Sequence, residues 1–520
     1  MKATYRYGAA QVQRQNSDMK NSRFRVLARL SYLTHLARPP VFALGLCLAL
    51  ACQAQATLPD EVRAVLQAAS VPETSISALV LPAGGGIPRL AHLEAQPRSP
   101  ASTMKLVTTL VALEELGPNF RWNTQLFMSS PQGSGTPRWG MLRGTLYLQG
   151  GGDPNFTWDS LRHMLRSLRA QGVRHIRGDW VLDRNYFKPA RPDLGVPPFD
   201  ETPTAYYNVI PDALLLGSNM LNLTLESDAR TTNVIVSPPL QGLRVVAMKP
   251  LDDTDCKQWD DDTLTATQEP KAGGRMLLRL AGPYPKNCKS STALNVMDRN
   301  VYIEQFVRSF WSELGGTWQG KLLDGSTPPD ARLLVAHPSD TLGNIVKLIN
   351  KPSDNAMTRS LFMTLGEMRK TSPRLEKSTD NAVVVVNDWF DRKGIVRSGL
   401  VLDNGSGLSR SERISAAQMA GLLQVGLQSH WYPEFAASLP IAGLDGTMRR
   451  RFKDSPLVGK IRIKTGTLRD TAAVAGYVRD VQGKDWVVVA FINDDNSKLG
   501  RPALDALMEW VARGDRTGGT

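Results

Sequence analysis

Two segments in which helix-like and strand-like patterns alternate are separated by a long run of short strand-like segments. In the first, a helix-like stretch (LPDEVRAVLQAA) precedes two strand-like ones, SISALVL and PRLAHLEA. In the last, the strand-like stretches KIRIKTG, AVAGYVRD and WVVVAFIND precede an amphipathic helix from Pro502 to Ala512. We therefore expect the two ends to make one discontinuous domain of α/β (α+β) class, interrupted by a β-rich insertion.

The same patterns predict how the 520 residues are divided. Short strand-like segments fill the insertion, with one clear helix from Trp158 to Ala170. The stretches from Lys188 to Pro203 and from Asp252 to Lys271 look like loops. The expected parts are a signal peptide (1–56), the first part of the discontinuous domain (57–120), one or two inserted domains (121–329) and the second part of the discontinuous domain (330–520).

The net charge of +13 is concentrated at the N-terminus, where residues 1–56 hold eight Lys or Arg and one acid. There, a basic region precedes the uncharged run VFALGLCLALAC and the small-residue site Ala54-Gln55-Ala56. The run is too short to span a bilayer, so the pattern is typical of a cleaved export signal, with Met19 an alternative start. We expect a periplasmic protein without nucleic-acid partners and with at most peripheral membrane association. Lipidation at Cys52 is the less favoured alternative.

Two of the four cysteines, Cys256 and Cys288, lie outside the export signal. An even pair in an exported chain favours a disulfide over a metal site. No cluster of further ligands lies nearby in the sequence, so we expect no metal.

The stretch SPASTMKLVTTLVALEELG, from Ser99 to Gly117, predicts a helix with apolar residues around most of its circumference. Ser102 and Lys105 stand at its start, three positions apart and therefore on one face. Ser102 could cap the helix while Lys105 reaches water. Alternatively, partial burial near the positive end of the helix makes a neutral Lys105 accessible as the base that activates Ser102. We call this pair the first motif.

Two later segments supply polar groups that such a serine would need. Ser353-Asp354-Asn355 (the second motif) precedes a helical run, and Lys464-Thr465-Gly466 (the third motif), followed by Thr467, ends a strand. The glycine would let the backbone of a ligand lie close. Each has a simpler interpretation, with Ser353 as a helix cap and Lys464 as a solvated charge on an edge strand. A decoy of the second motif stands at Thr379-Asp380-Asn381.

Together and in this order, the three motifs are the catalytic set of penicillin-binding proteins and serine β-lactamases. The stretches DNGSGLSR, LPIAGLDGTM and KTGTLRDTAAVAGY add to the likeness. The chain resembles the class C low-molecular-mass penicillin-binding proteins, which are D-alanyl-D-alanine carboxypeptidases and endopeptidases with a long insertion between the first and second motifs. The resemblance implies the penicillin-recognising fold, an antiparallel sheet flanked by helices. The sequence contains no Walker-type or dinucleotide-binding loop, so we expect no cofactor.

The resemblance also implies a role for each motif residue. Ser102 would attack the carbonyl between two D-alanines and form an acyl-enzyme, with Lys105 accepting its proton. Ser353 would pass the proton to the leaving amine, and Asn355 would bind the peptide amide. Lys464 would attract the terminal carboxylate, with hydrogen bonds from Thr465 and Thr467. The implied partners are peptidoglycan stem peptides and cross-links, with β-lactams as inhibitors.

Other classes of function fit the sequence less well. A Ser-His-Asp hydrolase commonly has a Gly-x-Ser-x-Gly elbow, and a zinc peptidase commonly has His-Glu-x-x-His; neither motif occurs. A β-lactamase is the alternative within the same chemistry, although the large insertion is unexpected for it. A non-catalytic peptidoglycan-binding module would be favoured by loss of a motif residue, and none is lost. Arg469 is more simply a solvated turn residue than a carboxylate contact, and Asp153 is assigned no role.

Overall fold

The computed structural model describes residues 57–129, 139–247, 250–259, 263–272, 275–368 and 374–514. The predicted export signal at residues 1–56 lies outside the described residues. Among the described residues, no helix combines the length and the apolar character that crossing a membrane requires.

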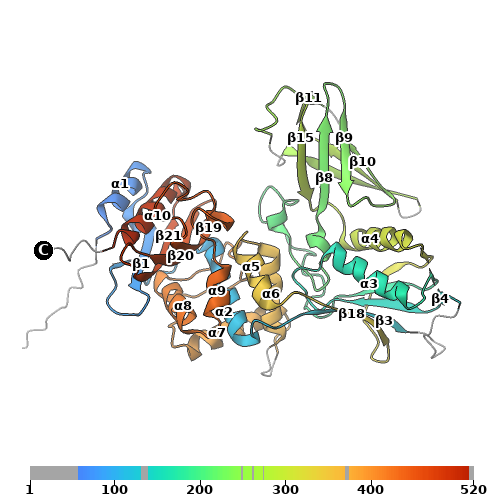
Figure 1. The fold of residues 1–520 in the computed structure, drawn as a ribbon, viewed down its shortest axis with the longest axis horizontal. Helices are drawn as coiled ribbons and strands as arrows, with labels where there is room; N and C mark the ends of the chain where they lie inside the picture. Colours follow the sequence, from blue (N-terminus) through green and yellow to red (C-terminus); the bar gives the residue numbers. More distant parts are fainter. Residues whose placement is uncertain are drawn as a thin grey trace, which may run out of the picture. The chain divides into compact units, whose positions relative to one another are not determined.

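One five-stranded antiparallel sheet is built from both ends of the chain. Figure 1 shows the blue strand β1 beside the red strand β21, and Ala78 pairs with Ala490 between them. Nearly every residue of β20 and β21 is buried, because helices cover both faces of the sheet. The strand order is β19 (Ile461–Leu468), β20 (Thr471–Arg479), β21 (Asp485–Asn493), β1 (Ile76–Pro82) and β2 (Leu90–His92).

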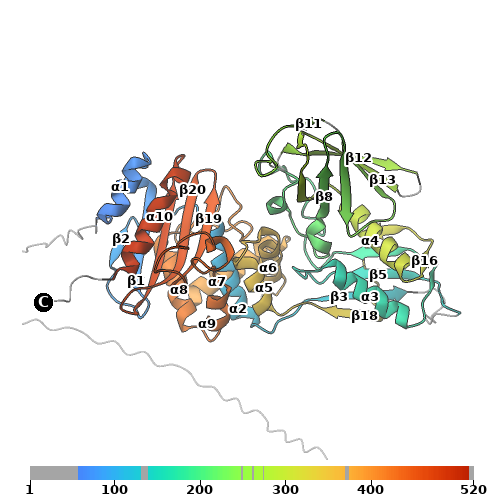
Figure 2. The ribbon, with the colours of Figure 1, turned by 45° about the horizontal axis from the view of Figure 1, so that its top comes forward.

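Helices form a layer on each face of this sheet. On one face, α1 (Asp60–Ala68) packs on α10 (Ser497–Ala512), which packs on β20 and β21 (Figure 2). On the other, α8 packs on β1 and β21, and the buried helix α2 lies among five neighbouring helices. The helices of this second layer are α2 (Lys105–Leu116), α5 (Leu342–Asn350), α6 (Asn355–Glu367), α7 (Ser378–Arg392), α8 (Ala416–Gln428) and α9 (Tyr432–Ser438).

Within its described residues, the insertion contains smaller sheets and the α-helices α3 (Trp158–Ala170) and α4 (Arg299–Glu313). One sheet has the order β17 (Leu322–Asp324), β7 (Trp180–Asp183), β5 (Thr145–Gln149), β3 (Asn123–Ser129) and β18 (Arg332–Pro338). A second joins β16 (Thr317–Trp318), β6 (His175–Ile176) and β4 (Met141–Leu142), and a third joins β15 (Lys289–Leu294), β8 (Leu221–Ser227) and β9 (Thr232–Ser237). A fourth joins β10 (Leu243–Ala247), β13 (Arg275–Ala281) and β12 (Thr265–Lys271), and β11 (Leu251–Asp252) pairs with β14 (Tyr284–Pro285).

One hydrophobic core joins the sheets and helices of the insertion. The ring of Trp158 on α3 stacks on that of Phe306 on α4 with centroids 5.3 Å apart, and its indole N–H donates to the Tyr302 hydroxyl. Cys256 and Cys288 are joined by a disulfide.

Three features differ from the sequence patterns. Residues 265–271, predicted to be loop, form β12. This strand is polar because it lies at a sheet edge and only two of its residues are even partly buried, so the usual apolar alternation is absent. The last helix begins at Ser497 rather than Pro502, so Pro502 lies inside it; burial of the larger apolar side chains Leu504, Leu507 and Met508 offsets the hydrogen bond that the proline removes. Strand β18 lies beyond residue 329 and pairs with β3 of the insertion.

Candidate active site

Lys105 of the first motif is completely buried beside Ser102. A 3₁₀ turn, η2 (Ala101–Met104), carries Ser102 and leads directly into α2, whose first nine residues are all buried. The Lys105 amine donates a hydrogen bond to Ser102 Oγ at 3.0 Å. The alternative in which Lys105 reaches water is therefore wrong, because this helix start lies under the rest of the domain and its lysine is 0% exposed.

The Lys105 amine also contacts two groups that lie far away in the sequence. It donates to Asn355 Oδ1 at 2.6 Å and to the backbone carbonyl of Ser406. Ser406 belongs to the DNGSGLSR stretch, which lies between β18 and the last three strands. The amine is thus surrounded by neutral oxygen acceptors, and no carboxylate lies within ion-pair distance of it among the described residues.

Burial is the main reason that the pKa of Lys105 falls, to about 7. The nearby carboxylates of Asp354 and Glu412 raise this pKa, and the guanidinium of Arg359 lowers it. A lysine with a pKa close to neutrality supplies both a neutral amine and an ammonium in comparable amounts, which suits a general acid–base.

The second motif lies at the start of α6, next to the first. Asp354 caps the helix by accepting from the Met357 N–H at 2.8 Å, so Ser353 is not the cap. Ser353 has a positive φ of 69°, a backbone conformation that serine adopts only when its surroundings enforce it. Asn355 is the first residue of α6; its amide Nδ2 donates to the carbonyl of Tyr207 at 2.9 Å while its Oδ1 accepts from Lys105.

The third motif lies on the edge strand β19, facing Ser353. The Lys464 amine is 0% exposed and donates to Ser353 Oγ at 2.8 Å, so the interpretation as a solvated edge charge is wrong. Burial, and then the charge of Lys105, lower the pKa of Lys464 well below its ordinary value. The amine is paired only with neutral oxygens, so a ligand carboxylate beside it would favour its charged form and would itself be attracted to it.

Gly466 permits β19 to approach the turn that carries Ser102. A Cβ added at Gly466 would lie 2.7 Å from the Pro100 carbonyl oxygen and 2.9 Å from the Ser102 backbone nitrogen. Thr465 donates its hydroxyl to that of Thr447 at 2.8 Å, and Thr467 is exposed. The backbone of the third motif therefore runs directly past the candidate nucleophile.

Sequence reasoning missed three groups that shape this site. Glu412 is buried and accepts hydrogen bonds from backbone N–H groups in the loop that carries Ser406, including Gly405 at 2.7 Å and Gly407 at 2.8 Å. Asp354 accepts from the hydroxyl of Tyr206 in the insertion. Asp354 and Glu412 stand in or beside recognised motifs, but nothing in the sequence places Tyr206 beside the second motif.

The remaining candidates lie away from this cluster. In the decoy, Asn381 accepts from the backbone N–H of Leu375 and donates to the carbonyls of Leu375 and Lys377, so it serves the start of α7. Arg469 is exposed just after β19. Asp153 is buried in the insertion, and burial raises its pKa to about 6. Among the described residues, no group of three or more His, Cys, Asp or Glu side chains could bind a metal ion.

Similarity to known proteins agrees with this geometry. The model of the D-Ala-D-Ala carboxypeptidase 3 (S13) family matches residues 58–513. The chain is 29% identical over 434 residues to a D-alanyl-D-alanine carboxypeptidase of Actinomadura sp. (strain R39), an alignment that spans 79% of this chain and 76% of that protein. It is 27% identical over 416 residues to the D-alanyl-D-alanine carboxypeptidase DacB of Haemophilus influenzae, spanning 78% of this chain and 83% of the relative.

The crystal structure of penicillin binding protein 4 (dacB) from Haemophilus influenzae has the same fold, with a TM-score of 0.70 at 23% identity. The match covers 87% of this chain and 100% of that one. The expected fold class is confirmed. With a family match over almost all of the described residues, this chain belongs to the D-Ala-D-Ala carboxypeptidase 3 (S13) family and is a serine-type hydrolase.

Proposed function

We propose that this protein cleaves the bond between the two terminal D-alanines of peptidoglycan stem peptides through an acyl-enzyme on Ser102. One observation carries the assignment of the nucleophile: the fully buried amine of Lys105, with a pKa of about 7, lies 3.0 Å from Ser102 Oγ. In its neutral form this amine accepts the serine proton as Oγ attacks the carbonyl carbon. Water then hydrolyses the ester and regenerates Ser102.

Proton transfer to the leaving group is proposed for Ser353. The oxygen of Ser353 accepts from Lys464, and the amine of Lys105 contacts the neighbouring Asn355. When the acyl–nitrogen bond breaks, the leaving amine needs a proton, and the hydroxyl of Ser353 relays to it the proton that Lys105 took from Ser102, so that both groups return to their starting state. Asn355 binds the peptide amide of the substrate, which requires it to exchange one of its present hydrogen bonds.

Recognition of the substrate carboxylate is proposed for the third motif. Lys464 supplies the cation, with the hydroxyls of Thr465 and Thr467 as further donors. The close approach of Gly466 to the Ser102 backbone nitrogen supports an oxyanion site between the N–H groups of Ser102 and Thr467. Donors of this kind commonly stabilise the transition state by about 3–4 kcal/mol.

We extend the proposal to cross-links, to inhibition and to location. Endopeptidase cleavage of D-alanyl cross-links is the same acyl transfer with a larger leaving group, and acylation of Ser102 by penicillins is the same attack on a β-lactam carbonyl. The predicted export signal favours a periplasmic protein acting on the wall.

Intact-mass analysis after incubation with a penicillin tests the proposal. We expect the wild type to gain the mass of one penicillin and to lose it slowly, while Ser102→Ala gains none. Ser99→Ala, a serine in the same segment, is the matched control and should be acylated like the wild type. Rapid turnover of the penicillin would favour a β-lactamase, and a folded wild type that gains no mass would contradict serine acylation altogether.

A further inference from the structure

A cavity of about 1010 Å³ lies beside the active site, and no residue of the three motifs lines it. Its walls come from the proline-rich stretch 188–211 of the insertion, from the start of α4, from α6 and from the loop 403–411. Asn208, which follows the Tyr207 that binds Asn355, belongs to this lining. A space of this size accommodates a peptide-sized ligand rather than a single ion.

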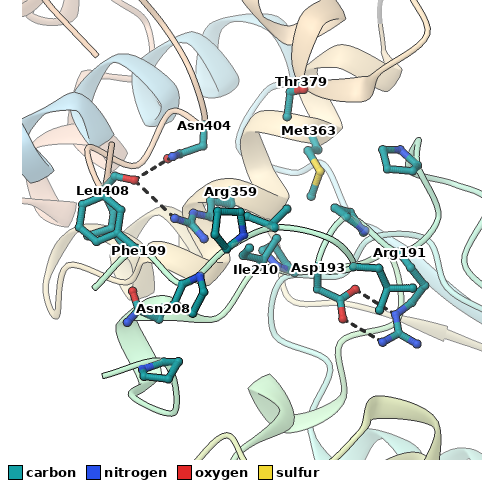
Figure 3. Close-up of a pocket in the computed structure, with 18 of the residues that line it drawn as sticks. Arg191, Asp193, Phe199, Asn208, Ile210, Arg359, Met363, Thr379, Asn404 and Leu408 are labelled. Carbon is teal, nitrogen blue, oxygen red and sulfur yellow. Dashed lines mark hydrogen bonds and ion pairs between the residues drawn. The ribbon is translucent and has the colours of Figure 1, made fainter. Parts of the chain in front are cut away.

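Cations outnumber acids around the cavity. Two of the acids, Asp193 and Asp298, are engaged by arginines of the lining: Arg191 lies 2.8 Å from Asp193 and 3.6 Å from Asp298, and Figure 3 shows the first of these pairs. The third acid, Asp403, accepts from the side chain of Asn404 at 3.3 Å. The charged lining residues are Lys188, Arg191, Arg299, Arg359, Lys377 and Arg410 against Asp193, Asp298 and Asp403.

Arg359 is the unusual member of this lining because it is buried and has no ion-pair partner among the described residues. The residue is 9% exposed, and in Figure 3 its side chain extends from α6 toward the carbonyl of Leu408. Its two hydrogen bonds, to the carbonyls of Val209 and Leu408, are long at 3.4 and 3.5 Å, and its Nε has no partner.

A guanidinium in this state is poised to bind an anion. It carries five N–H donors, of which the protein uses two weakly. Burial lowers its pKa, a sign that the charged form is poorly solvated, and only the more distant charges of Asp403 and Glu412 offset this. A carboxylate on its free donors would supply the pairing that a buried cation otherwise lacks.

We propose that this cavity binds a short acidic peptide, with one of its carboxylates on Arg359. The exposed Lys188 and Lys377, which take part in no ion pair within the part of the chain that the structure describes, attract further carboxylates at the rim. The prolines 189, 192, 197 and 198 stiffen one wall, so little entropy is lost when a ligand fills the space.

Binding of N-acetyl-triglutamate amide to the full-length Ser102→Ala protein, measured by calorimetry, tests this. The Ser102 variant removes turnover, so the result does not depend on the proposed peptidase activity. We expect one saturable site, at least tenfold weaker binding of the uncharged triglutamine analogue, and weakening as salt rises. Free glutarate binding as tightly as the peptide would overturn the peptide assignment, and no saturable binding of triglutamate would overturn the site.

Variants locate the site. Arg359→Gln should weaken triglutamate binding at least tenfold, with Arg359→Lys in between, while Arg501→Gln on the exposed side of α10 leaves it unchanged. If Arg359→Gln fails to fold, the rim variant Lys188→Gln/Lys377→Gln, on exposed side chains, should weaken binding about threefold and reduce its salt dependence. Unchanged affinity in a folded Arg359→Gln protein, or in the rim variant, would contradict the proposal.

Discussion

The amine of Lys105 lies 2.6 Å from Oδ1 of Asn355, a residue 250 positions later in the chain. The first and second motifs are therefore directly hydrogen-bonded across the full length of the insertion. Since Asn355 also donates to the carbonyl of Tyr207, one asparagine connects the candidate base to the insertion.

Acylation should follow the ionisation of Lys105. Because the neutral amine is the proposed base and its pKa is about 7, the rate constant for acylation by penicillin should rise as pH increases through about 7. Lys105→Met should lower that rate constant about 10²–10⁴-fold and abolish its rise with pH. Stopped-flow or mass-based acylation rates measure both effects. Lys460→Met, at an exposed lysine, is the control and should behave like the wild type. If the acylation rate constant of Lys105→Met still rises through pH 7, another group is the base.

Glu412→Gln should shift the same pH profile in a defined direction. In its ionised form, Glu412 favours the ammonium of Lys105, as Asp354 does, while Arg359 and burial oppose it. Removing the carboxylate lowers the pKa of Lys105, so the rise in acylation should move to lower pH. The loop that carries Ser406 also loses a charged acceptor, at a cost of about 1–3 kcal/mol in the free energy of unfolding. Glu376→Gln, at an exposed glutamate, should change neither the pH profile of acylation nor the free energy of unfolding. A shift of the Glu412→Gln profile to higher pH would show that the Glu412 carboxylate does not raise the pKa of Lys105.

Tyr206→Phe should slow acylation by several-fold, because the buried carboxylate of Asp354 loses the hydroxyl that donates to it from the insertion. A lost hydrogen bond to a buried charged group costs about 1–3 kcal/mol. Tyr207→Phe is the matched control: it removes a hydroxyl that donates to Asp200 but keeps the backbone carbonyl that binds Asn355. Equal penicillin acylation rates in Tyr206→Phe and the wild type would exclude a positioning role for Tyr206.

Gly466→Ala should nearly abolish acylation. The added methyl would lie 2.7 Å from the Pro100 carbonyl oxygen and 2.9 Å from the Ser102 nitrogen, so β19 must move away from the nucleophile. Overpacking of this kind costs about 1–3 kcal/mol, and displaced oxyanion donors cost more. The comparison is Gly84→Ala, where nothing lies within 4 Å. Acylation rates and thermal unfolding together separate a displaced site from a protein that merely lost stability.

Loss of the Cys256–Cys288 disulfide should destabilise the insertion without affecting acylation. The cysteines are 32 positions apart, and a cross-link closing a loop of this length contributes about 3–4 kcal/mol by restricting the unfolded chain. The double variant Cys256→Ala/Cys288→Ala should therefore unfold at lower temperature in calorimetry. Its rate of acylation by penicillin should equal that of the wild type, and a large decrease would indicate that the insertion couples to the nucleophile through this region.

Much of the local structure could be predicted from the sequence alone. Helix α3 begins and ends where its pattern of apolar residues predicted. Strand β19, which carries the third motif, and the two strands that follow it also lie where apolar runs predicted strands. Ser102 and Lys105 could be paired because three positions along a helical turn place them on one face. Such features depend on short-range periodicity, which the order of residues encodes directly.

The tertiary structure alone decided which distant groups meet and how deeply they are buried. Three features of the site could not be predicted from sequence periodicity, because each involves segments that only packing brings together. They are the Ser406 carbonyl at Lys105, the Tyr206 hydroxyl at Asp354 and the buried guanidinium of Arg359. Burial also sets the chemistry: the sequence indicated a lysine beside a serine, but its pKa of about 7 follows from complete loss of solvent and from charges supplied by other elements.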